Sequence, residues 1–224
     1  MLAKNGDPDQ TALGPMLDRD DEQRARAIAH VIEGTLHGTS SGIDTATVAE
    51  QRPILFQPNE SGHPDVTPVV VEKAVRFFLL DSGIRRKTRD QIQKISALRA
   101  AHSKQFSEQI ARGVEATGLA CDSLSAGDHR GLWRAINDLG VLLQKLDLEP
   151  KSLTRLREDA RKEGIALKIT GAGGGGFFIA YHPDDEKLKS WCHSLPPSYR
   201  PTALDVPATN PLFSPDYVRD VVHS

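Results

Sequence analysis

The sequence predicts an α+β fold in which an antiparallel or mixed sheet is covered by helices on one side. An apolar run of strand length at 75–81 precedes long stretches whose apolar residues recur at three- and four-residue steps, which is typical of amphipathic helices. Two further apolar runs, at 166–170 and 177–182, flank a cluster of glycines and are predicted to be strands. Strands that alternate with helices in this order favour a sandwich of a sheet and a helical layer.

The first third of the chain is predicted to contain one helix and a small sheet. Residues 1–19 are rich in Gly, Pro and Asp, so we expect a flexible lead there. The apolar residues of 20–35 recur at helical spacing. Residues 47–49 and 53–56 are typical of two short strands, and 59–63 of a turn.

The rest of the chain is predicted to begin with the strand 75–81, whose apolar content favours burial on both faces. A single long helix is expected at 88–119, starting at a threonine cap. Further helices are expected at 128–146, 152–164 and 186–195, followed by an edge strand at 202–206. Asp128 at a helix start is interpreted as a cap rather than a metal ligand, and Trp191 as a core residue.

The composition favours a globular protein without attraction to polyanions. The 224 residues include 28 Lys plus Arg and 30 Asp plus Glu, a formal charge of −2. Nucleic acid and anionic membranes are therefore not expected partners. No run reaches membrane-spanning length and no secretory signal is recognised, so we expect a cytoplasmic location. Cys121 and Cys192 lack a C-x-x-C spacing and indicate neither a disulfide nor a zinc site.

Five of the six residues from Gly171 to Gly176 are glycine. Glycine loses more backbone freedom on folding than any other residue, so this cluster indicates torsions or a close approach that a Cβ would forbid. Consecutive backbone N–H groups can form a concavity for phosphate oxygens. A flexible turn is the alternative that composition alone leaves open.

A second motif surrounds Glu33, near the end of the predicted helix 20–35. A carboxylate at a helix C-terminus is electrostatically unfavourable unless a cation lies beside it. Small hydroxyl residues, a glycine and Asp44 follow, so two carboxylates can converge where one binds a metal and the other accepts a proton. A solvated acid at Glu33 and a helix or turn cap at Asp44 are the alternatives.

Together these motifs resemble the GHMP small-molecule kinases, and within them the mevalonate kinases. The resemblance rests on Glu33, on the His-Gly-x-x-Ser-Gly-Ile-Asp run of 37–44 and on the Lys-Ile-Thr-Gly-Ala-Gly-Gly-Gly-Gly run of 168–176. The Arg-Lys-Thr-Arg run of 86–89 is also similar to the start of a helix that follows a C-domain strand in mevalonate kinases.

The resemblance implies phosphate transfer from ATP to a hydroxyl, with Mg²⁺ as the metal cofactor. Asp44 would be the catalytic aspartate and Glu33 the magnesium ligand. The acceptor or phosphate side would be lined by His37, Ser41 and Thr170. The loop near the nucleotide phosphates would consist of Gly171, Ala172, Gly173, Gly174, Gly175 and Gly176.

The family's earlier Pro-x-x-x-Gly-Leu-Gly-Ser-Ser-Ala loop is absent from the sequence. The resemblance therefore implies a remnant of the family's N-terminal domain at 20–73, a complete C-terminal α/β sandwich domain at 74–206 and an extended tail at 207–224. Ser40, where proline is common, and Thr45, where asparagine is common, weaken the assignment of mevalonate more than that of a kinase.

Three functions remain open from the sequence. The first is phosphorylation of mevalonate by a partial chain that needs the missing nucleotide-binding half. Such a chain would pair with a separate N-terminal half, form a homo-oligomer or be a fragment of a longer product. The second is a kinase for a sugar or for phosphomevalonate. The third is a non-catalytic binding or regulatory remnant of the fold.

Overall fold

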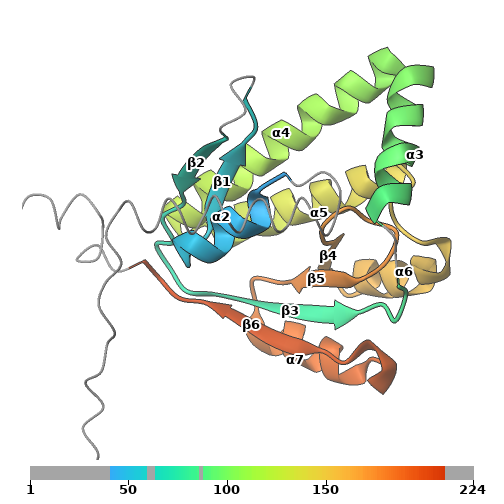
Figure 1. The fold of residues 1–224 in the computed structure, drawn as a ribbon. Helices are drawn as coiled ribbons and strands as arrows, with labels where there is room; N and C mark the ends of the chain where they lie inside the picture. The colour runs from blue at the N-terminus through green and yellow to red at the C-terminus, as the bar shows by residue number, and fades with distance from the viewer. Residues whose placement is uncertain (1–40, 60–63, 86–87, 210–224) are drawn as a thin grey trace, which may run out of the picture. The chain divides into compact units, whose positions relative to one another are not determined.

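The computed structural model describes residues 41–59, 64–85 and 88–209. The chain divides into two compact units, Met1–Pro68 and Val69–Ser224, and each is described by itself. The predicted helix 20–35 lies outside the described residues, as do most of the predicted turn and the tail beyond residue 209. Figure 1 gives the labels of the helices and strands. Within the described ranges, none of the helices combines the length and apolar character needed to cross a bilayer.

The first unit contains one helix and a two-stranded antiparallel sheet: α2 (Ile43–Glu50), β1 (Ile54–Gln57) and β2 (Asp65–Pro68). β1 confirms the strand predicted at 53–56. The strand predicted at 47–49 is wrong, because these residues continue α2. Thr47 Oγ1 donates a hydrogen bond to the Ile43 carbonyl at 2.7 Å, a helical contact that a β-branched residue can make without entering a strand.

The second unit is built on a four-stranded antiparallel sheet with the order β4-β5-β3-β6. Its strands are β3 (Val75–Asp81), β4 (Ala166–Ile169), β5 (Phe177–Tyr181) and β6 (Thr202–Val206). All four were predicted from the sequence, and with the helices they confirm the α+β fold. Phe78 of β3 lies opposite Ala180 on β5 and opposite Ala203 on β6.

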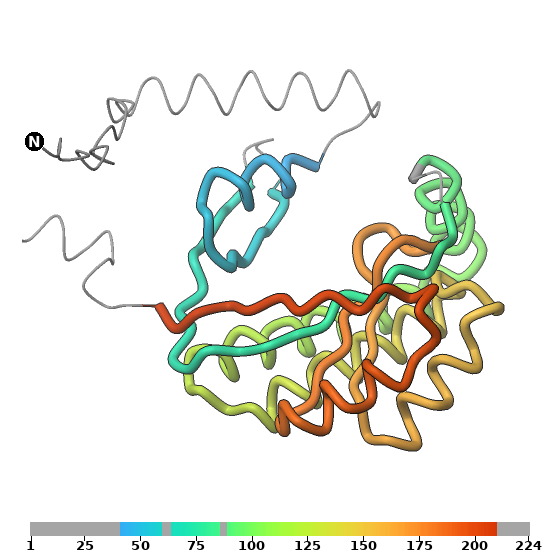
Figure 2. Tube along the Cα trace, turned by 90° about the horizontal axis from the view of Figure 1, so that it is seen from below, coloured from blue at the N-terminus to red at the C-terminus, as the bar shows by residue number. Residues whose placement is uncertain are grey.

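One face of this sheet packs against two helices that follow β3 in the chain. The buried side chains of that face include Phe78 and Leu80, which pack with α6 (Thr154–Lys162) and α7 (Asp185–Ser194). Figure 2 shows both helices on the same side of β3 and β6. On the other face Val75 is buried against Leu132 and Ile136, whereas Leu79 is only half-buried. The predicted burial of 75–81 on both faces therefore holds at the start of the strand and not along its whole length. Helices thus pack on both faces of the sheet, and not on one side only as expected.

That other face also carries two exposed apolar side chains. Phe177 on β5 is 48% exposed and Leu204 on β6 is 40% exposed. Both are strand residues whose neighbours Leu79 and Ile179 are half-buried. Among the described residues of the second unit, this part of the sheet therefore exposes apolar side chains.

The single helix predicted at 88–119 is wrong, because the structure has two helices there. α3 (Thr88–Ala101) and α4 (Ser103–Ala126) meet at His102, whose backbone leaves the helical conformation (φ −137°, ψ 51°). Figure 1 shows α3 steeply inclined to α4. The break lets residues of both helices pack on one apolar cluster, which contains Ile95, Leu98, Phe106, Leu142, Leu146 and Leu148.

The remaining helices confirm the predicted ones with shifted ends: α5 (His129–Lys145), then the 3₁₀ turn Lys151–Leu153 that leads into α6, then α7 and the 3₁₀ turn Pro197–Tyr199. Asp128 caps α5 as predicted, because its carboxylate accepts hydrogen bonds from the N–H groups of Arg130 and Gly131 at 3.0 Å each.

The core position of Trp191 is confirmed. This α7 side chain is 5% exposed, and its indole Nε1 donates to Asp159 of α6 at 3.0 Å. Cys192 beside it is fully buried, and burial raises the pKa of its thiol to about 12. These contacts join α6 and α7 above the sheet.

Helix α5 approaches the edge strand β4 closely enough to require glycine. A Cβ added to Gly140 would lie 2.1 Å from the carbonyl oxygen of Leu167, whereas one added to Gly118 of α4 would meet nothing within 4 Å. We therefore expect Gly140→Ala to lower the free energy of unfolding by more than about 2 kcal/mol. Gly118→Ala is the matched control and should raise it by about 0.5–1 kcal/mol, because alanine favours helices. Urea denaturation measures both, and equal effects would contradict this packing.

Candidate active site

Asp44, the predicted catalytic carboxylate, lies in the first turn of α2 and is exposed. The N-cap position belongs to Gly42, which adopts a left-handed conformation (φ 78°) without a side-chain cap. Ser41 Oγ accepts a hydrogen bond from the Ile43 N–H at 3.4 Å. Asp44 is therefore not the N-cap residue, and the helix N-terminus is a favourable place for a carboxylate.

The predicted site residues fall in different parts of the chain. Glu33 and His37 lie outside the described residues, Ser41 and Asp44 lie in the first unit, and residues 170–176 lie in the second. Within the described part of the chain, no group of three or more His, Cys, Asp or Glu side chains is placed to hold a metal ion. The convergence of Glu33 and Asp44 on a metal thus remains a prediction.

The glycines of the loop between β4 and β5 are required by the backbone conformation. Positive φ angles occur at Gly171 (59°), Gly173 (82°), Gly174 (75°), Gly175 (145°) and Gly176 (82°). L-residues with a side chain rarely adopt such angles. Residues 171–176, called the glycine loop from here on, are therefore a defined structure rather than an arbitrary flexible turn.

The close approach made by the glycine loop is to the protein's own backbone. The N–H of Gly174 donates to the Leu148 carbonyl at 2.7 Å, and that of Gly176 donates to the Ile84 carbonyl at 3.0 Å. A Cβ on Gly173 would lie 2.7 Å from the same Leu148 oxygen. At the base of the loop, the Thr170 N–H and hydroxyl both donate to the Phe177 carbonyl at 2.9 Å.

These bonds limit how much of the loop can bind an anion. The N–H groups of Gly174 and Gly176 already donate to carbonyls of the chain. Those of Gly171 and Ala172 make no hydrogen bond within the described residues. A phosphate cradle would therefore use the first part of the loop.

The glycine loop rests on a turn that sequence reasoning missed. This turn, 147–150, follows α5 and begins at Asp147 in a left-handed conformation (φ 53°). Lys94 of α3 pairs with the Asp147 carboxylate at 2.6 Å and also donates to its carbonyl. Glu149 pairs with Arg157 of α6. Glu149 before Pro150 is a weak sequence signal for such a turn. Nothing in the sequence indicates that Lys94, 53 residues before Asp147, is its partner.

Two charged groups near the loop have shifted pKa values. The hydrogen bond from Lys94 lowers the pKa of the Asp147 carboxyl, and the positive charge of Lys94 adds to the effect. Burial lowers the pKa of Lys168 on β4, whose Nζ donates to the Ile169 carbonyl at 3.2 Å. The loop is thus flanked by groups held in fixed positions.

Two hollows adjoin the glycine loop. One of about 250 Å³ borders Gly174 and is lined by Gln91, Lys94 and the 147–150 turn. The other, of about 560 Å³, lies at Gly176 beside Arg85 and Arg200. Both are open to solvent, and their walls carry acids as well as bases: Asp147 and Glu149 line the first hollow and Asp81 lines the second.

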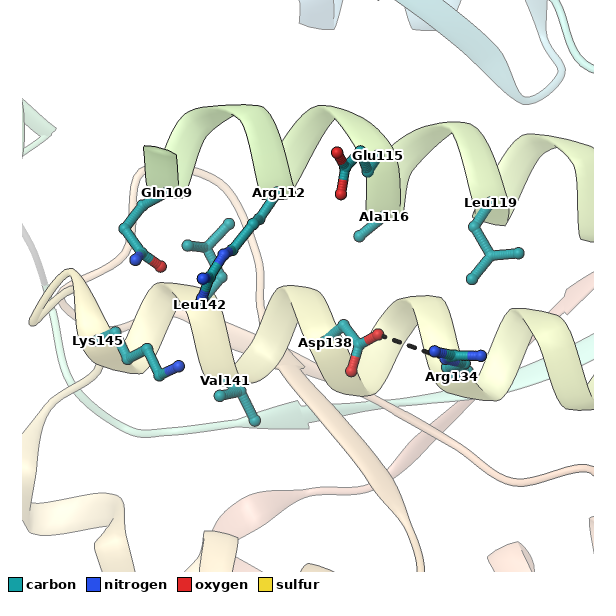
Figure 3. Close-up of a pocket in the computed structure, with 10 residues that line it drawn as sticks. All are labelled: Gln109, Arg112, Glu115, Ala116, Leu119, Arg134, Asp138, Val141, Leu142 and Lys145. Carbon is teal, nitrogen blue, oxygen red and sulfur yellow. Dashed lines mark ion pairs between the residues drawn. The ribbon is translucent and has the colours of Figure 1, made fainter. Parts of the chain in front are cut away.

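A third hollow lies away from the loop, between α4 and α5. Figure 3 shows this groove of about 450 Å³, with Arg112 and Glu115 on α4 facing Arg134 and Asp138 on α5. Arg134 and Asp138 pair with each other at 3.9 Å. Charges of both signs alternate along the groove, and none of the predicted site residues lines it.

The short distance between Gly173 and the Leu148 carbonyl oxygen predicts that a side chain at Gly173 lowers the free energy of unfolding strongly. Gly83 is the matched control, because its φ is also positive (66°) but a Cβ there would meet nothing within 4 Å. Gly83→Ala should cost about 1–2 kcal/mol of unfolding free energy, the cost of the left-handed conformation alone. Gly173→Ala should cost at least about 1 kcal/mol more, because the Leu148 backbone must also move. Chemical denaturation measures the unfolding free energy of both variants, and equal losses in Gly83→Ala and Gly173→Ala would contradict this contact.

The Lys94–Asp147 pair predicts a change in acid titration. Its side chains are 42% and 61% exposed, so the pair should contribute less than about 1 kcal/mol. Because the folded pKa of Asp147 is lowered, this contribution is present above the unfolded pKa and disappears as the pH falls through the folded one. Lys94→Met should raise the Asp147 pKa toward its ordinary value in an NMR titration, whereas Lys104→Met should leave it unchanged. An unaltered Asp147 pKa in Lys94→Met would show that Lys94 is not the cause of the lowered pKa.

The sequence matches a known family and several curated proteins. Residues 120–196 match the family described as GHMP kinases C terminal. The mevalonate kinase of Gibberella zeae is 28% identical over 197 residues, which cover 81% of this chain and 38% of that protein. The mevalonate kinase of Archaeoglobus fulgidus is 26% identical over 166 residues, which cover 74% of this chain and 54% of that protein. The chain thus spans roughly a third to a half of the length of these relatives.

Solved structures share the fold. The L. major mevalonate kinase in complex with R-mevalonate matches with a TM-score of 0.74 at 20% identity, covering 84% of this chain and 59% of that one. The Streptococcus pneumoniae phosphomevalonate kinase in complex with phosphomevalonate and AMPPNP matches with a TM-score of 0.63 at 17% identity, covering 77% and 58%. Residues 120–196, glycine loop included, are thus similar to the family described as GHMP kinases C terminal, and the solved structures share the fold of the chain.

Proposed function

We propose that this chain takes part in ATP-dependent transfer of phosphate to the hydroxyl of a small molecule, with mevalonate as the acceptor. The observation that carries the proposal is the match to mevalonate kinases from two distant organisms over 74–81% of the chain. The match to a fold that binds R-mevalonate in the L. major enzyme supports the same acceptor.

The residues of the chain divide the chemical work as follows. Asp44 accepts or orients the proton of the attacking hydroxyl, and its exposed position in the first turn of α2 leaves its carboxylate accessible. Glu33 offers oxygen ligands of the kind that Mg²⁺ prefers. Bound magnesium would offset the charge of the nucleotide phosphates. Phosphoryl transfer depends mainly on such positioning and charge neutralisation.

The second unit contributes donors to the phosphate side. The N–H groups of Gly171 and Ala172, which have no hydrogen bond to other described residues, can donate to phosphate oxygens, while Gly174 and Gly176 hold the loop in place. The Thr170 hydroxyl donates its proton to the Phe177 carbonyl, so toward a ligand it would act as an acceptor. Ser41 and His37 complete the proposed acceptor side.

The proposed reaction requires a nucleotide-binding half that this sequence lacks. The chain spans 38% of the Gibberella relative, and one part of the sheet in the second unit exposes Phe177 and Leu204. An apolar face of this kind is usually covered by a partner surface. We propose that the nucleotide-binding half of such a kinase, on a separate polypeptide or in a longer form of this chain, provides this cover, and a second copy of the chain is the alternative.

Phosphomevalonate is the second candidate acceptor. The supporting observation is the fold shared with the Streptococcus pneumoniae phosphomevalonate kinase, and two basic residues, Arg85 and Arg200, at the hollow beside Gly176 suit a further phosphate. The acceptor is best tested directly.

The test combines this chain with a nucleotide-binding half, for example the first half of the Archaeoglobus fulgidus mevalonate kinase, by co-expression. ADP release is measured with mevalonate, phosphomevalonate and galactose. We expect turnover with mevalonate and a loss of about 10²–10⁴-fold in Asp44→Asn, because the proton acceptor is removed. Asp65→Asn is the matched control, an exposed carboxylate of the same unit, and should keep full turnover.

Glu33→Ala should instead raise the magnesium concentration needed for half-maximal turnover. Full activity of both Asp44→Asn and Glu33→Ala would reject the assigned roles. A stable complex that releases no ADP with any of the three acceptors would favour the non-catalytic remnant. Faster turnover with phosphomevalonate or galactose would reassign the acceptor.

A further inference from the structure

Two charged side chains of the second unit are buried against each other. Glu149 is 7% exposed and Arg157 is 9% exposed, and no other acid or base among the described residues is classed as buried. The Arg157 Nε donates to the two carboxylate oxygens of Glu149 at 2.7 and 2.9 Å, and a guanidinium NH₂ donates to one of them as well. This geometry fixes the direction of both side chains.

The pair is placed to fix the seat of the glycine loop. Glu149 directly follows Leu148, whose carbonyl accepts the Gly174 N–H at 2.7 Å and whose backbone limits the approach of Gly173. The Leu148 N–H in turn donates to the Leu143 carbonyl at 3.0 Å. The 147–150 turn therefore connects the end of α5, helix α6 and the loop.

The second ion pair of the turn is different in character. Lys94 and Asp147 are 42% and 61% exposed, so water screens their attraction. Glu149 and Arg157 are shielded from water and cannot separate without leaving a charge buried and unpaired. The buried pair is thus the one that can hold the turn in a single position.

We propose that the Glu149–Arg157 pair is a positioning device for the glycine loop. By fixing the 147–150 turn, it keeps the Leu148 carbonyl under Gly174 and so maintains the left-handed conformation of the loop. Arg157 is a positioning residue in this account, because it acts on the loop through Glu149 and Leu148.

A purely structural role is the competing explanation, and the two can be separated. Replacing both members of a buried ion pair by apolar residues often leaves stability unchanged, whereas removing one member does not. The double variant Glu149→Leu/Arg157→Met should therefore keep the overall fold while losing the fixed direction of the pair. If the fold is kept, faster opening of the glycine loop relative to the core shows that the pair fixes the position of the loop and does not only stabilise the fold.

The experiment measures amide hydrogen exchange in the full chain. The readout is the exchange rate of the Gly174 amide divided by that of Ala180, a buried residue of β5. We expect the double variant to raise this ratio at least tenfold. Leu156→Ala, a buried α6 position at 4% exposure, is the control that lowers global stability, and it should accelerate loop and core together with no rise in the ratio.

Arg157→Lys keeps the charge but not the two-pronged contact, so it should raise the ratio by an intermediate amount. Arg157→Lys also tests the positioning role on its own if the double variant does not fold. An unchanged ratio in Arg157→Lys and in any folded double variant, or the same rise in Leu156→Ala, would overturn the positioning role.

The consequence for catalysis rests on the proposed function. In an active assembly, Arg157→Lys should lower kcat several-fold and leave the KM for the acceptor unchanged, since the loop is placed on the phosphate side. A raised exchange ratio with unaltered kcat would separate the loop from phosphoryl transfer while leaving the positioning role intact. An inactive assembly would reject the function, and the exchange ratio would still decide the inference.

Discussion

Two backbone hydrogen bonds, from Gly174 to Leu148 and from Gly176 to Ile84, fix the position of the glycine loop in the second unit. They bring three chain segments so close that a Cβ on Gly173 or Gly175 would lie 2.7 or 2.5 Å from a carbonyl oxygen. The loop can form only when strand β3 has ended at the right residue and α5 has turned at 147–150. The sheet register and the packing of α5 against β4 are therefore conditions for the loop, and not only for stability.

The same bonds indicate that the glycines of the second part of the loop allow close contact with the chain's own backbone. A glycine-rich segment between strands is commonly interpreted as a ligand cradle, yet here the second part of the loop is occupied by the chain's own carbonyls. Only Gly171 and Ala172 keep their N–H groups available within the described residues. An anion at this loop would therefore find few backbone donors there, and further donors would have to come from groups outside the loop.

The sequence predicted the strands of the second unit well, because each is a short apolar run bounded by polar residues or glycine. It was less successful where tertiary packing decides: the periodic pattern crosses His102 without interruption, and the break there follows from two helices sharing one cluster. The strand predicted at 47–49 failed because a short β-branched run fits a helix equally well. The motifs indicated the glycine loop and Asp44, but the buried partners Glu149 and Arg157 could not be found, since burial and pairing depend on the folded chain.

Helix α7 has a consequence for how this protein can be studied. Its Cys192 is fully buried and its thiol has a pKa of about 12, so alkylating reagents cannot react with it while α7 lies on the sheet. Cys121 on α4 is only partly covered. The first thiol to be modified should accordingly belong to Cys121, and the delayed labelling of the second would time the detachment of α7 without any engineered probe.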